Sequence, residues 1–207
     1  MGSLTKTERS IIIGSLLGDG YLRVMKGRSN AFLEINHTYA QKEYVDWKHH
    51  MLRSICKSYP VKRNGNGTRI AYRFNTRQHT ELTELWRMFY PQGKKQIPKN
   101  IQLDPIVLAI WYMDDGSKCR ERDVYLNTQQ FSIEDQQICV NMLSNLNIES
   151  SLNRDKQYWR IRIKTSSIPT FFAIIAPHII PTMQYKFSYN PVETCSNRNG
   201  VVLVENG

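Results

Sequence analysis

The chain has 207 residues, and its 28 Lys and Arg outnumber its 18 Asp and Glu, which gives a formal charge of +10 and a pI near 9.5. Apolar residues make up 41% and charged residues 22%, which excludes a disordered chain and fits one domain or two small packed ones. The longest apolar run, residues 171–180, is too short to cross a bilayer. The positive charge favours a polyanionic partner, and charge that serves only solubility is the alternative.

The N-terminal residues and the cysteines bear on location. Residues 5–10 are polar, which argues against a signal peptide. The four cysteines have no CxxC spacing, so they indicate neither a zinc site nor a redox motif. We therefore expect a soluble intracellular protein with free thiols.

An approximate internal repeat organises the chain. An apolar helix is expected over residues 10–17 and ends in Gly18-Asp19-Gly20, and a second is expected over residues 104–113 and ends in Asp114-Asp115-Gly116. The second run opens with a good N-cap and a helix-start proline. A glycine after each aspartate is a natural stop signal. The sequence thus predicts two apolar helices that end alike.

The segments after each apolar helix also follow one order. In the first half we expect a strand over 31–36, an amphipathic helix over 41–56, a basic strand over 68–77 and a helix over 79–90. In the second half the corresponding segments are 123–127, 132–143, 159–164 and 168–176. The predicted order is αββαββα, twice, which is typical of an α+β fold with antiparallel sheets.

The aspartates at the helix ends are candidate metal ligands. A carboxylate just past a helix C-terminus lies near the negative end of the helix dipole, which disfavours it. A bound cation reverses that sign, because carboxylate and carbonyl oxygens are good ligands for Mg²⁺. In a basic chain, two such ends would provide what metal-assisted phosphodiester hydrolysis needs. The alternative is that Asp-Gly is only a turn dipeptide. Two copies at matching places favour function.

Residues 11–20 and 108–116 resemble the two signature helices of the LAGLIDADG homing endonucleases. The wider pattern is similar to the two-motif, single-chain branch that includes a yeast mitochondrial intron-encoded endonuclease. The similarity extends from about Glu8 to Asn190 and includes the segments 94–98, 108–118, 126–129 and 180–186.

The resemblance implies the arrangement of the chain. Two pseudo-symmetric halves, 1–100 and 101–190, would place their antiparallel sheets as a DNA-binding saddle around the packed motif helices. A C-terminal tail, 191–207, would follow them. Gly14 and Ser15 would permit close helix approach, and Trp111 would be the bulky counterpart of Ser15, so the interface should be asymmetric.

The resemblance also implies the roles of site residues. Asp19 and Asp115 would hold the metal, with Gly18 and Asp114 at the matching preceding positions, where the backbone carbonyl contributes. The resemblance further implies two catalytic lysines near the scissile phosphates, Lys95 and Lys186. Two glutamines, Gln41 and Gln129, would order metal-bound water. For the lysines, the alternative is an ordinary solvated side chain.

The basic strands are the candidate DNA-reading surface. Alternation puts Arg69, Arg73 and Arg77 on one face of the first, and Arg160, Arg162 and Lys164 on one face of the second. Arginine on a β-ribbon can read guanine in the major groove. Cations at strand ends and in loops would contact phosphates: Arg23, Lys26, Arg28, Lys62, Arg63, Lys118, Arg120, Arg122, Arg154 and Lys156. For any one of them, a solvated face is the alternative.

The resemblance implies a Mg²⁺-dependent, site-specific endonuclease for double-stranded DNA, with Mn²⁺ or Ca²⁺ as binding substitutes. It would act as a monomer without an obligate protein partner or a membrane, in an organelle (mitochondrion or chloroplast) or a bacterial cytoplasm. The alternatives are an intron maturase that binds RNA on the same scaffold, and a DNA-binding regulator on a degenerate one. Loss of an acidic residue at a motif end would mark the regulator, and neither is lost.

Overall fold

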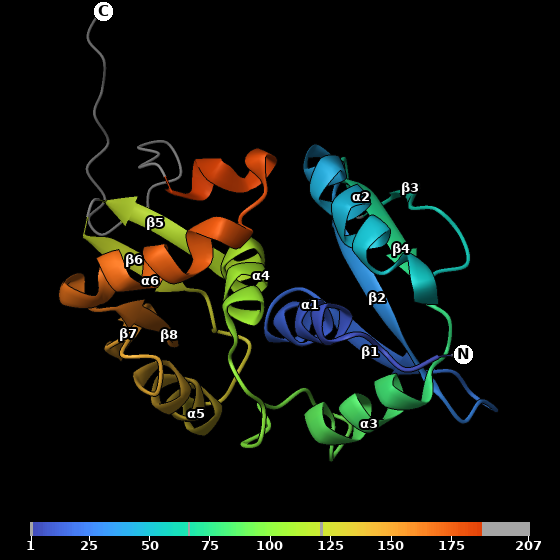
Figure 1. Cartoon of the computed structure of the whole chain (residues 1–207), viewed down its shortest axis with the longest axis horizontal. Helices are drawn as coiled ribbons and strands as arrows, with labels where there is room; N and C mark the ends of the chain where they lie inside the picture. Colours follow the sequence, from blue (N-terminus) through green and yellow to red (C-terminus); the bar gives the residue numbers. More distant parts are fainter. Residues whose placement is uncertain (1, 66, 121, 188–207) are drawn as a thin grey trace, which may run out of the picture.

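The computed structural model describes residues 2–65, 67–120 and 122–187. Two helices, α1 (Lys6–Leu17) and α4 (Pro105–Asp115), lie side by side at the centre, with one half of the chain on either side of them (Figure 1). Each half contains a four-stranded antiparallel sheet, in the orders β1-β2-β4-β3 and β5-β6-β8-β7. The predicted α+β class and the repeated αββαββα order are confirmed.

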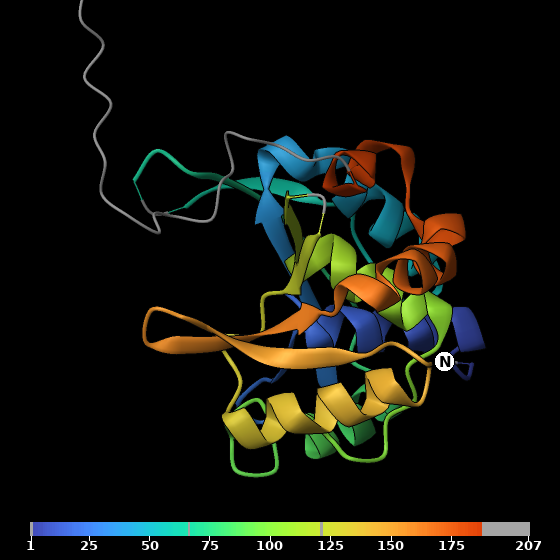
Figure 2. The same ribbon diagram turned by 90° about the vertical axis from the view of Figure 1, so that its left-hand side faces the viewer.

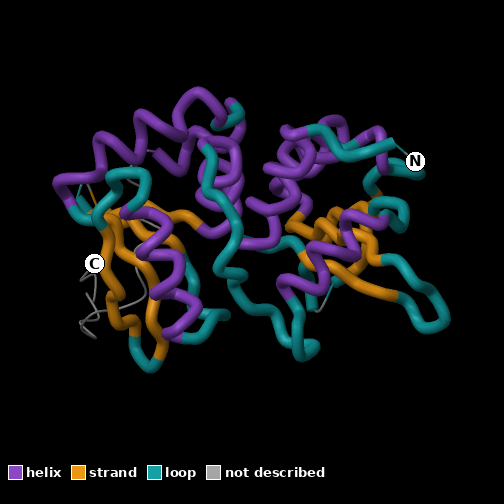
Figure 3. Tube along the Cα trace, turned by 60° about the horizontal axis from the view of Figure 1, so that its bottom comes forward, coloured by secondary structure: helices purple, strands orange, loops and turns teal. Residues whose placement is uncertain are grey.

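The elements occur in the same order in both halves, and a loop joins the halves beneath the central helices (Figure 3). The first half continues with β1 (Tyr21–Val24), β2 (Ala31–Thr38), α2 (Lys42–Met51), β3 (Val61–Asn64), β4 (Ile70–Asn75) and α3 (Thr80–Phe89). The second half continues with β5 (Gly116–Arg120), β6 (Asp123–Leu126), α5 (Ile133–Ser144), β7 (Ser150–Asp155), β8 (Tyr158–Ile163) and α6 (Ile168–Ile175).

Some predicted boundaries are wrong. The expected helix over 41–56 is α2 with short 3₁₀ turns before and after it. The basic strand expected over 68–77 is only β4, so its first and last arginines lie outside the strand. A 3₁₀ segment, Pro181–Phe187, follows α6 and was not predicted, and it carries one of the candidate lysines. The expected tail over 191–207 lies outside the described residues.

Local hydrogen bonds fix where the central helices begin. The Thr5 side chain accepts from the Glu8 N–H, and the Glu8 side chain accepts from the Thr5 N–H, which makes a complete capping box at α1. At α4 the carboxylate of Asp104 accepts from the Val107 N–H at 2.9 Å, as the sequence predicted. Since both caps satisfy otherwise unpaired donors, the two helices start, and hence end, at defined residues.

Small residues let α1 approach α4. A Cβ at Gly14 would lie 2.6 Å from Ile110 Cβ and 2.7 Å from the Val107 carbonyl oxygen, so glycine is required there. Ser15 and Trp111 are both fully buried. One motif therefore contributes a small side chain and the other an indole, which confirms the expected asymmetry.

Two expectations about the chain as a whole can be checked. Cys56 and Cys139 are free thiols, as predicted, but Cys119 takes part in a disulfide bond, so the prediction of free thiols is wrong there. Among the described residues, no helix is long and apolar enough to span a membrane.

Candidate active site

The candidate catalytic carboxylates lie at the ends of the two motif helices. Asp115 is the last residue of α4, and Asp19 follows the residue that caps α1. Burial, together with the charges of Asp19 and Asp114, raises the pKa of Asp115 to about 8. Burial and the Asp114 charge also raise the pKa of Asp19. These carboxylates repel one another in a partly buried place, which is an arrangement that a divalent cation would stabilise.

Each motif end also has its own lysine. The Lys95 ammonium donates to the carbonyl oxygens of Gly18 and Gly20, both at 2.9 Å. The Lys186 ammonium donates to the Asp114 carbonyl oxygen at 3.0 Å. Burial lowers the pKa of Lys95 to about 8, against the opposing effect of Asp115. The structure thus places both predicted lysines at the motif ends, one per half.

A buried polar cluster that the sequence analysis missed lies beneath these carboxylates. The Asp114 carboxylate accepts from the Lys48 ammonium at 2.8 and 3.0 Å and from the Tyr44 hydroxyl at 2.8 Å. His37 lies on the other side, with its Nδ1 3.5 Å from Asp19 Oδ2. Burial, and next the Lys48 charge, lowers the pKa of His37 to about 4, so the ring is neutral at physiological pH.

The donor set fits a divalent metal. Ligand atoms of Asp19, His37 and Asp114 lie within 4.8 Å of one another. The Asp114 carboxylate is occupied by Lys48 and Tyr44, however, so its side chain is a poor candidate for the ligand. Asp19, whose side chain is 48% exposed, and the partly exposed Asp115 are the accessible carboxylates. The expectation that Asp114 contributes through its backbone stays a prediction, and its carbonyl oxygen accepts a hydrogen bond from Lys186.

Two glutamines lie near the carboxylates. The Gln130 amide donates to Asp115 Oδ2 at 3.4 Å and to the Gly18 carbonyl at 3.5 Å, so it links the two motif ends. The sequence analysis named its neighbour, Gln129, for this position, and the hydrogen bonds belong to Gln130. The Gln41 side chain contacts the His37 ring instead of a motif end.

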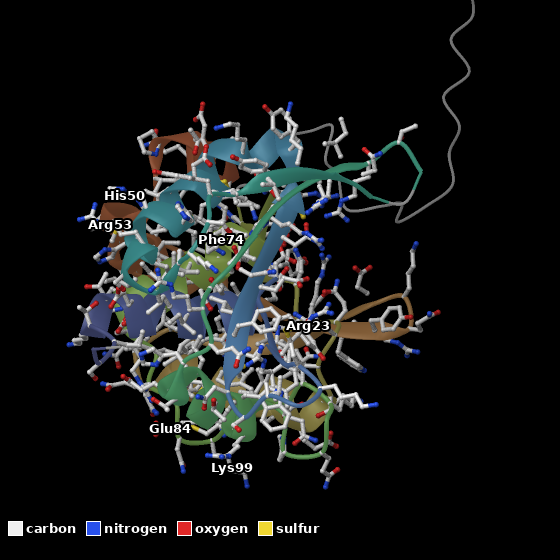
Figure 4. The ribbon with its side chains drawn as sticks, turned by 90° about the vertical axis from the view of Figure 1, so that its right-hand side faces the viewer. Arg23, His50, Arg53, Phe74, Glu84 and Lys99 are labelled. Carbon is white, nitrogen blue, oxygen red and sulfur yellow. The ribbon has the colours of Figure 1, made fainter. Side chains whose placement is uncertain are left out.

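Strand register decides which cations of the first sheet share a face. Arg73 pairs with Asn36, Arg63 pairs with Ala71, and Arg23 pairs with Phe32, which puts these arginines on the face that is not covered by α2 and α3. Arg23 lies on the side to which the hairpins project (Figure 4). We call this the open face of the sheet, and the second sheet has a corresponding one. Arg69 and Arg77 lie just outside β4.

Some of the predicted DNA-binding residues lie on the opposite face. Lys62 pairs with the buried Tyr72, and its ammonium lies 3.8 Å from the Tyr39 ring centroid. Lys118 pairs with Val124 and donates to the Phe187 carbonyl at 2.9 Å. Arg154 pairs with Trp159, on the face of β8 that packs on the core. Register therefore separates these three cations from the arginines of the open faces, and their expected phosphate contacts stay a prediction.

The basic residues of β8 are partly neutralised. Arg160 is buried, lies over the Tyr125 ring at 3.8 Å and is 3.7 Å from Asp155. Arg162 donates to Asp123 at 2.9 Å. Lys164 lies beyond the end of β8 and pairs with Glu149. The other predicted contacts lie in loops, turns or strand ends and, where their side chains are described, are exposed: Lys26, Arg28, Arg120, Arg122 and Lys156.

Several polar atoms on the open faces have no hydrogen-bond partner in the described part of the chain. Asn36 Oδ1, Asn153 Oδ1, Arg160 Nε and Arg162 Nε are buried without a hydrogen-bond partner among the described residues. Such atoms are costly unless a ligand or water pairs with them. Asn36 and Asn153 were not identified from the sequence, although Asn36 lies in a strand where apolar and polar residues alternate. The hairpins β3–β4 and β7–β8 project to the same side of the molecule (Figure 2), so the open faces continue into two arms.

The raised pKa of Asp115 predicts a pH effect on stability. Between about pH 6.5 and 8 the folded chain keeps a proton on Asp115 that the unfolded chain has lost, so the free energy of unfolding should fall as pH rises. The lowered pKa of His37 makes stability rise with pH only below about pH 6.5, the pKa of the unfolded chain's histidine, so it does not oppose this fall at higher pH. We expect the melting temperature in a chelator to decrease across this window in the unmodified chain. In Asp115→Asn the decrease should be smaller, and an equal slope would contradict the assignment.

Known proteins share this sequence pattern and fold. The family model described as "LAGLIDADG DNA endonuclease family" matches residues 9–171. A probable intron-encoded endonuclease of Wickerhamomyces canadensis is 29% identical, over 91% of this chain and 87% of that protein. A cytochrome b mRNA maturase bI2 of Saccharomyces cerevisiae is 31% identical over 90% of this chain, and the match spans 48% of that protein.

The structural comparisons agree. The homing endonuclease I-WcaI bound to its DNA recognition sequence superposes with a TM-score of 0.83 at 27% identity, covering 92% of this chain and 89% of that one. I-DmoI in complex with DNA and Mn, at 14% identity and a TM-score of 0.54, covers 82% of this chain and 96% of that one, and it shares the fold. With its two motif helices at the centre and the family model matching most of its length, the chain belongs to the LAGLIDADG DNA endonuclease family.

Proposed function

We propose that the chain is a site-specific homing endonuclease that hydrolyses one phosphodiester bond on each strand of double-stranded DNA with a divalent metal, Mg²⁺ in the cell. The observation that carries the proposal is the meeting of Asp19, Asp115, Lys95 and Lys186 at the ends of the two motif helices. The similarity to I-WcaI, which was solved bound to its DNA recognition sequence, supports it.

Each residue of the site would have a distinct role in the reaction. Asp19 and Asp115 would hold the metal, with the carbonyl oxygens of Gly18 and Asp114 beside them. The metal would supply Lewis-acid stabilisation and lower the pKa of a water nucleophile. Lys95 and Lys186 would stabilise the charge that develops on the phosphate, since their ammonium groups lie at the motif ends. Gln130, bonded to both motif ends, would orient water, a role that the sequence analysis gave to Gln41 and Gln129.

We further propose that one copy suffices. Each half, 1–100 and 101–190, would bind one side of a long, pseudo-symmetric DNA site with the open face of its sheet. Because the chain already contains both motifs, it needs no second copy and no other protein. We place it inside the cell, in an organelle or a bacterial cytoplasm.

A cleavage assay tests this function. Purified protein would be incubated with a pool of DNA fragments that contain intron-insertion sequences, with Mg²⁺, with Ca²⁺ or with chelator. We expect double-strand cuts at one sequence in Mg²⁺ and none in chelator. Sequence-specific binding without any cut would indicate the regulator.

RNA binding is the second candidate function. Two relatives, from Saccharomyces cerevisiae and Debaryomyces hansenii, are named cytochrome b mRNA maturases. Intron RNA would be the partner. Stimulation of intron splicing by a protein that cuts no DNA containing the insertion site would favour this reading. Both activities in one protein would show a dual role.

The open face predicts a difference between two neighbouring cations. Arg73→Ala should weaken DNA affinity by about 1–3 kcal/mol, because an arginine in the major groove reads a base edge. Lys62→Ala is the matched control, since Lys62 lies on the adjacent strand but faces the other way. Fluorescence anisotropy with labelled target DNA would measure both. An equal loss for both variants would contradict the assigned faces.

Substitution of Lys95 should lower the rate of DNA cleavage without weakening DNA binding. Lys95→Met removes an ammonium that contacts the first motif end, and the cleavage rate should fall about a hundredfold. Lys94→Met is the control, because Lys94 is exposed. Single-turnover rates at saturating protein would separate the two. If Lys94→Met slowed cleavage as much, a general charge effect would replace the specific role.

A further inference from the structure

The two motifs differ at one position, and the difference is complementary. The second motif has Asp114 where the first has Gly18. A Cβ at Gly18 would lie 2.4 Å from Asp114 Cβ and 2.8 Å from its Oδ2. The glycine of the first motif therefore leaves the space that the aspartate of the second motif fills. The Asp114 side chain extends past Gly18 and reaches residues of the first half.

The partners of Asp114 all belong to the other half. Lys48 and Tyr44 come from α2, and His37 comes from β2. The side chains of Lys48 and Asp114 are 0% exposed, and that of His37 is 2% exposed. His37 Nε2 is 3.9 Å from Asp114 Oδ1, and His37 Nδ1 is 3.5 Å from Asp19 Oδ2. One continuous set of contacts thus runs from Lys48 to the exposed Asp19 carboxylate.

Stability alone does not explain a buried ion pair at this place. Removing two charges from water costs several kcal/mol, and apolar side chains of similar size are often as stable or more so. Most of the rest of the α1–α4 interface is apolar and tightly packed, and its polar members, Ser10 hydrogen-bonded to Asp104 and the buried Ser15, carry no buried ion pair. The charged group is found where the interface reaches Asp19.

We propose that Lys48, Asp114, Tyr44 and His37 form an inter-half lock, a set of positioning residues that hold the Asp19 carboxylate in place for the metal. The lock joins α2 of the first half to α4 of the second, so it also sets the two motif ends relative to each other. This inference rests on the proposed metal-dependent function.

The lock is one-sided. The Lys48 side chain is completely buried, whereas Lys95 and Lys186 at the motif ends keep partial exposure. At the other motif end, Asp115 contacts Gln130, and among the described residues no buried histidine bridges it to an ion pair. Asp19 is therefore contacted by His37, which lies against the Lys48–Asp114 ion pair, whereas Asp115 is contacted by the Gln130 amide.

The test removes both charges at once. In Lys48→Met/Asp114→Asn no buried charge is left without a partner, and the backbone carbonyl of residue 114 remains. Mn²⁺ binding to the full chain would be followed by electron paramagnetic resonance, with Asp19→Asn as the reference for loss of the site. Thermal unfolding, DNA affinity without metal and Mg²⁺-dependent cleavage would be measured on the same proteins.

We expect the double variant to melt within a few degrees of the unmodified chain and to bind DNA equally well. Its Mn²⁺ affinity and its cleavage rate should each fall at least tenfold. Wild-type Mn²⁺ affinity and rate in a folded double variant would overturn the lock. If the double variant does not fold, His37→Gln decides: it keeps the ion pair, and an unchanged Mn²⁺ affinity would overturn the positioning role.

The two proposals fail in different ways. A wild-type chain that binds Mn²⁺ through Asp19 but cuts no DNA would overturn the nuclease function, and the Mn²⁺ measurements would still decide the lock. A wild-type chain that cuts, together with a double variant that cuts equally, would overturn only the lock. Wild-type protein without any Asp19-dependent Mn²⁺ binding would overturn both.

Discussion

Asp115→Asn is expected to abolish DNA cleavage and to leave DNA binding intact. The substitution keeps the size and shape of the side chain, but it replaces the carboxylate with a neutral amide, which is a much weaker ligand for a divalent cation. If the metal contributes about 4 kcal/mol to stabilisation of the transition state, the rate should fall at least about a thousandfold. Asp19→Asn should have the same effect, because the charges of the two carboxylates influence each other and both would hold the proposed metal.

The measurement is a single-turnover cleavage rate with saturating protein and Mg²⁺. DNA affinity, measured in chelator near pH 7, should be unchanged, since Asp115 with its raised pKa already carries a proton there and the variant removes little charge. Asp46→Asn is a matched control: Asp46 pairs with Lys42 on α2, away from the motif ends. Wild-type cleavage by Asp115→Asn would show that this carboxylate does not hold the metal.

The parts of the site that could be predicted are those fixed by local sequence. The motif helices have strong apolar patterns and clear caps, so their ends, and with them Asp19 and Asp115, could be located in advance. Lys95 and Lys186 were named by resemblance alone, because they lie in irregular segments where periodicity gives no signal.

Lys48 and His37 could not be predicted, because their burial depends on the other half of the chain. On a helix read from the sequence, a lysine is expected on the solvated face. Lys48 lies on the same face as Tyr44, four residues earlier, and a lysine within an apolar stripe was the available signal. Only the approach of α4 shows why it is there.

Strand register decides which candidate DNA-binding residues share a face of the sheet. Alternation within one strand correctly placed Arg160 and Arg162 on a common face, but the face of a cation in an adjacent strand depends on which residue it pairs with. Only register therefore shows that Lys62, Lys118 and Arg154 do not share the open faces. The sequence also could not show that Arg160 is packed on Tyr125, because that contact joins two strands.

The two halves repeat one topology but differ where they meet. Glycine faces aspartate at positions 18 and 114, and serine and tryptophan occupy matching places one turn earlier. A symmetric pair of aspartates at Gly18 and Asp114 would put two carboxylates in one buried space, which Coulomb repulsion forbids. A single chain with two different motifs can instead use one carboxylate as a link between its halves.

Lys48→Met should show how much that link matters to folding. The substitution leaves the Asp114 carboxylate buried without its ammonium partner, and the free energy of unfolding should fall by about 3–5 kcal/mol at neutral pH. Burial alone would raise the pKa of Asp114, and Lys48 overrides it to hold that pKa below its ordinary value. Without Lys48 the pKa should rise, so acidification should reduce the stability difference between variant and wild type.

Urea denaturation at pH 7 and pH 5 would measure the loss, and Lys42→Met provides the control on the same helix. Lys42 also pairs with an aspartate, but that pair is solvent-exposed, so its removal should change stability little. Restoration of stability in Lys48→Met/Asp114→Asn would show that the cost comes from an uncompensated charge and not from the loss of lysine packing. Equal stability of Lys48→Met and Lys42→Met would instead mean that water or another cation reaches Asp114, and the two halves would then be joined by their apolar helices alone.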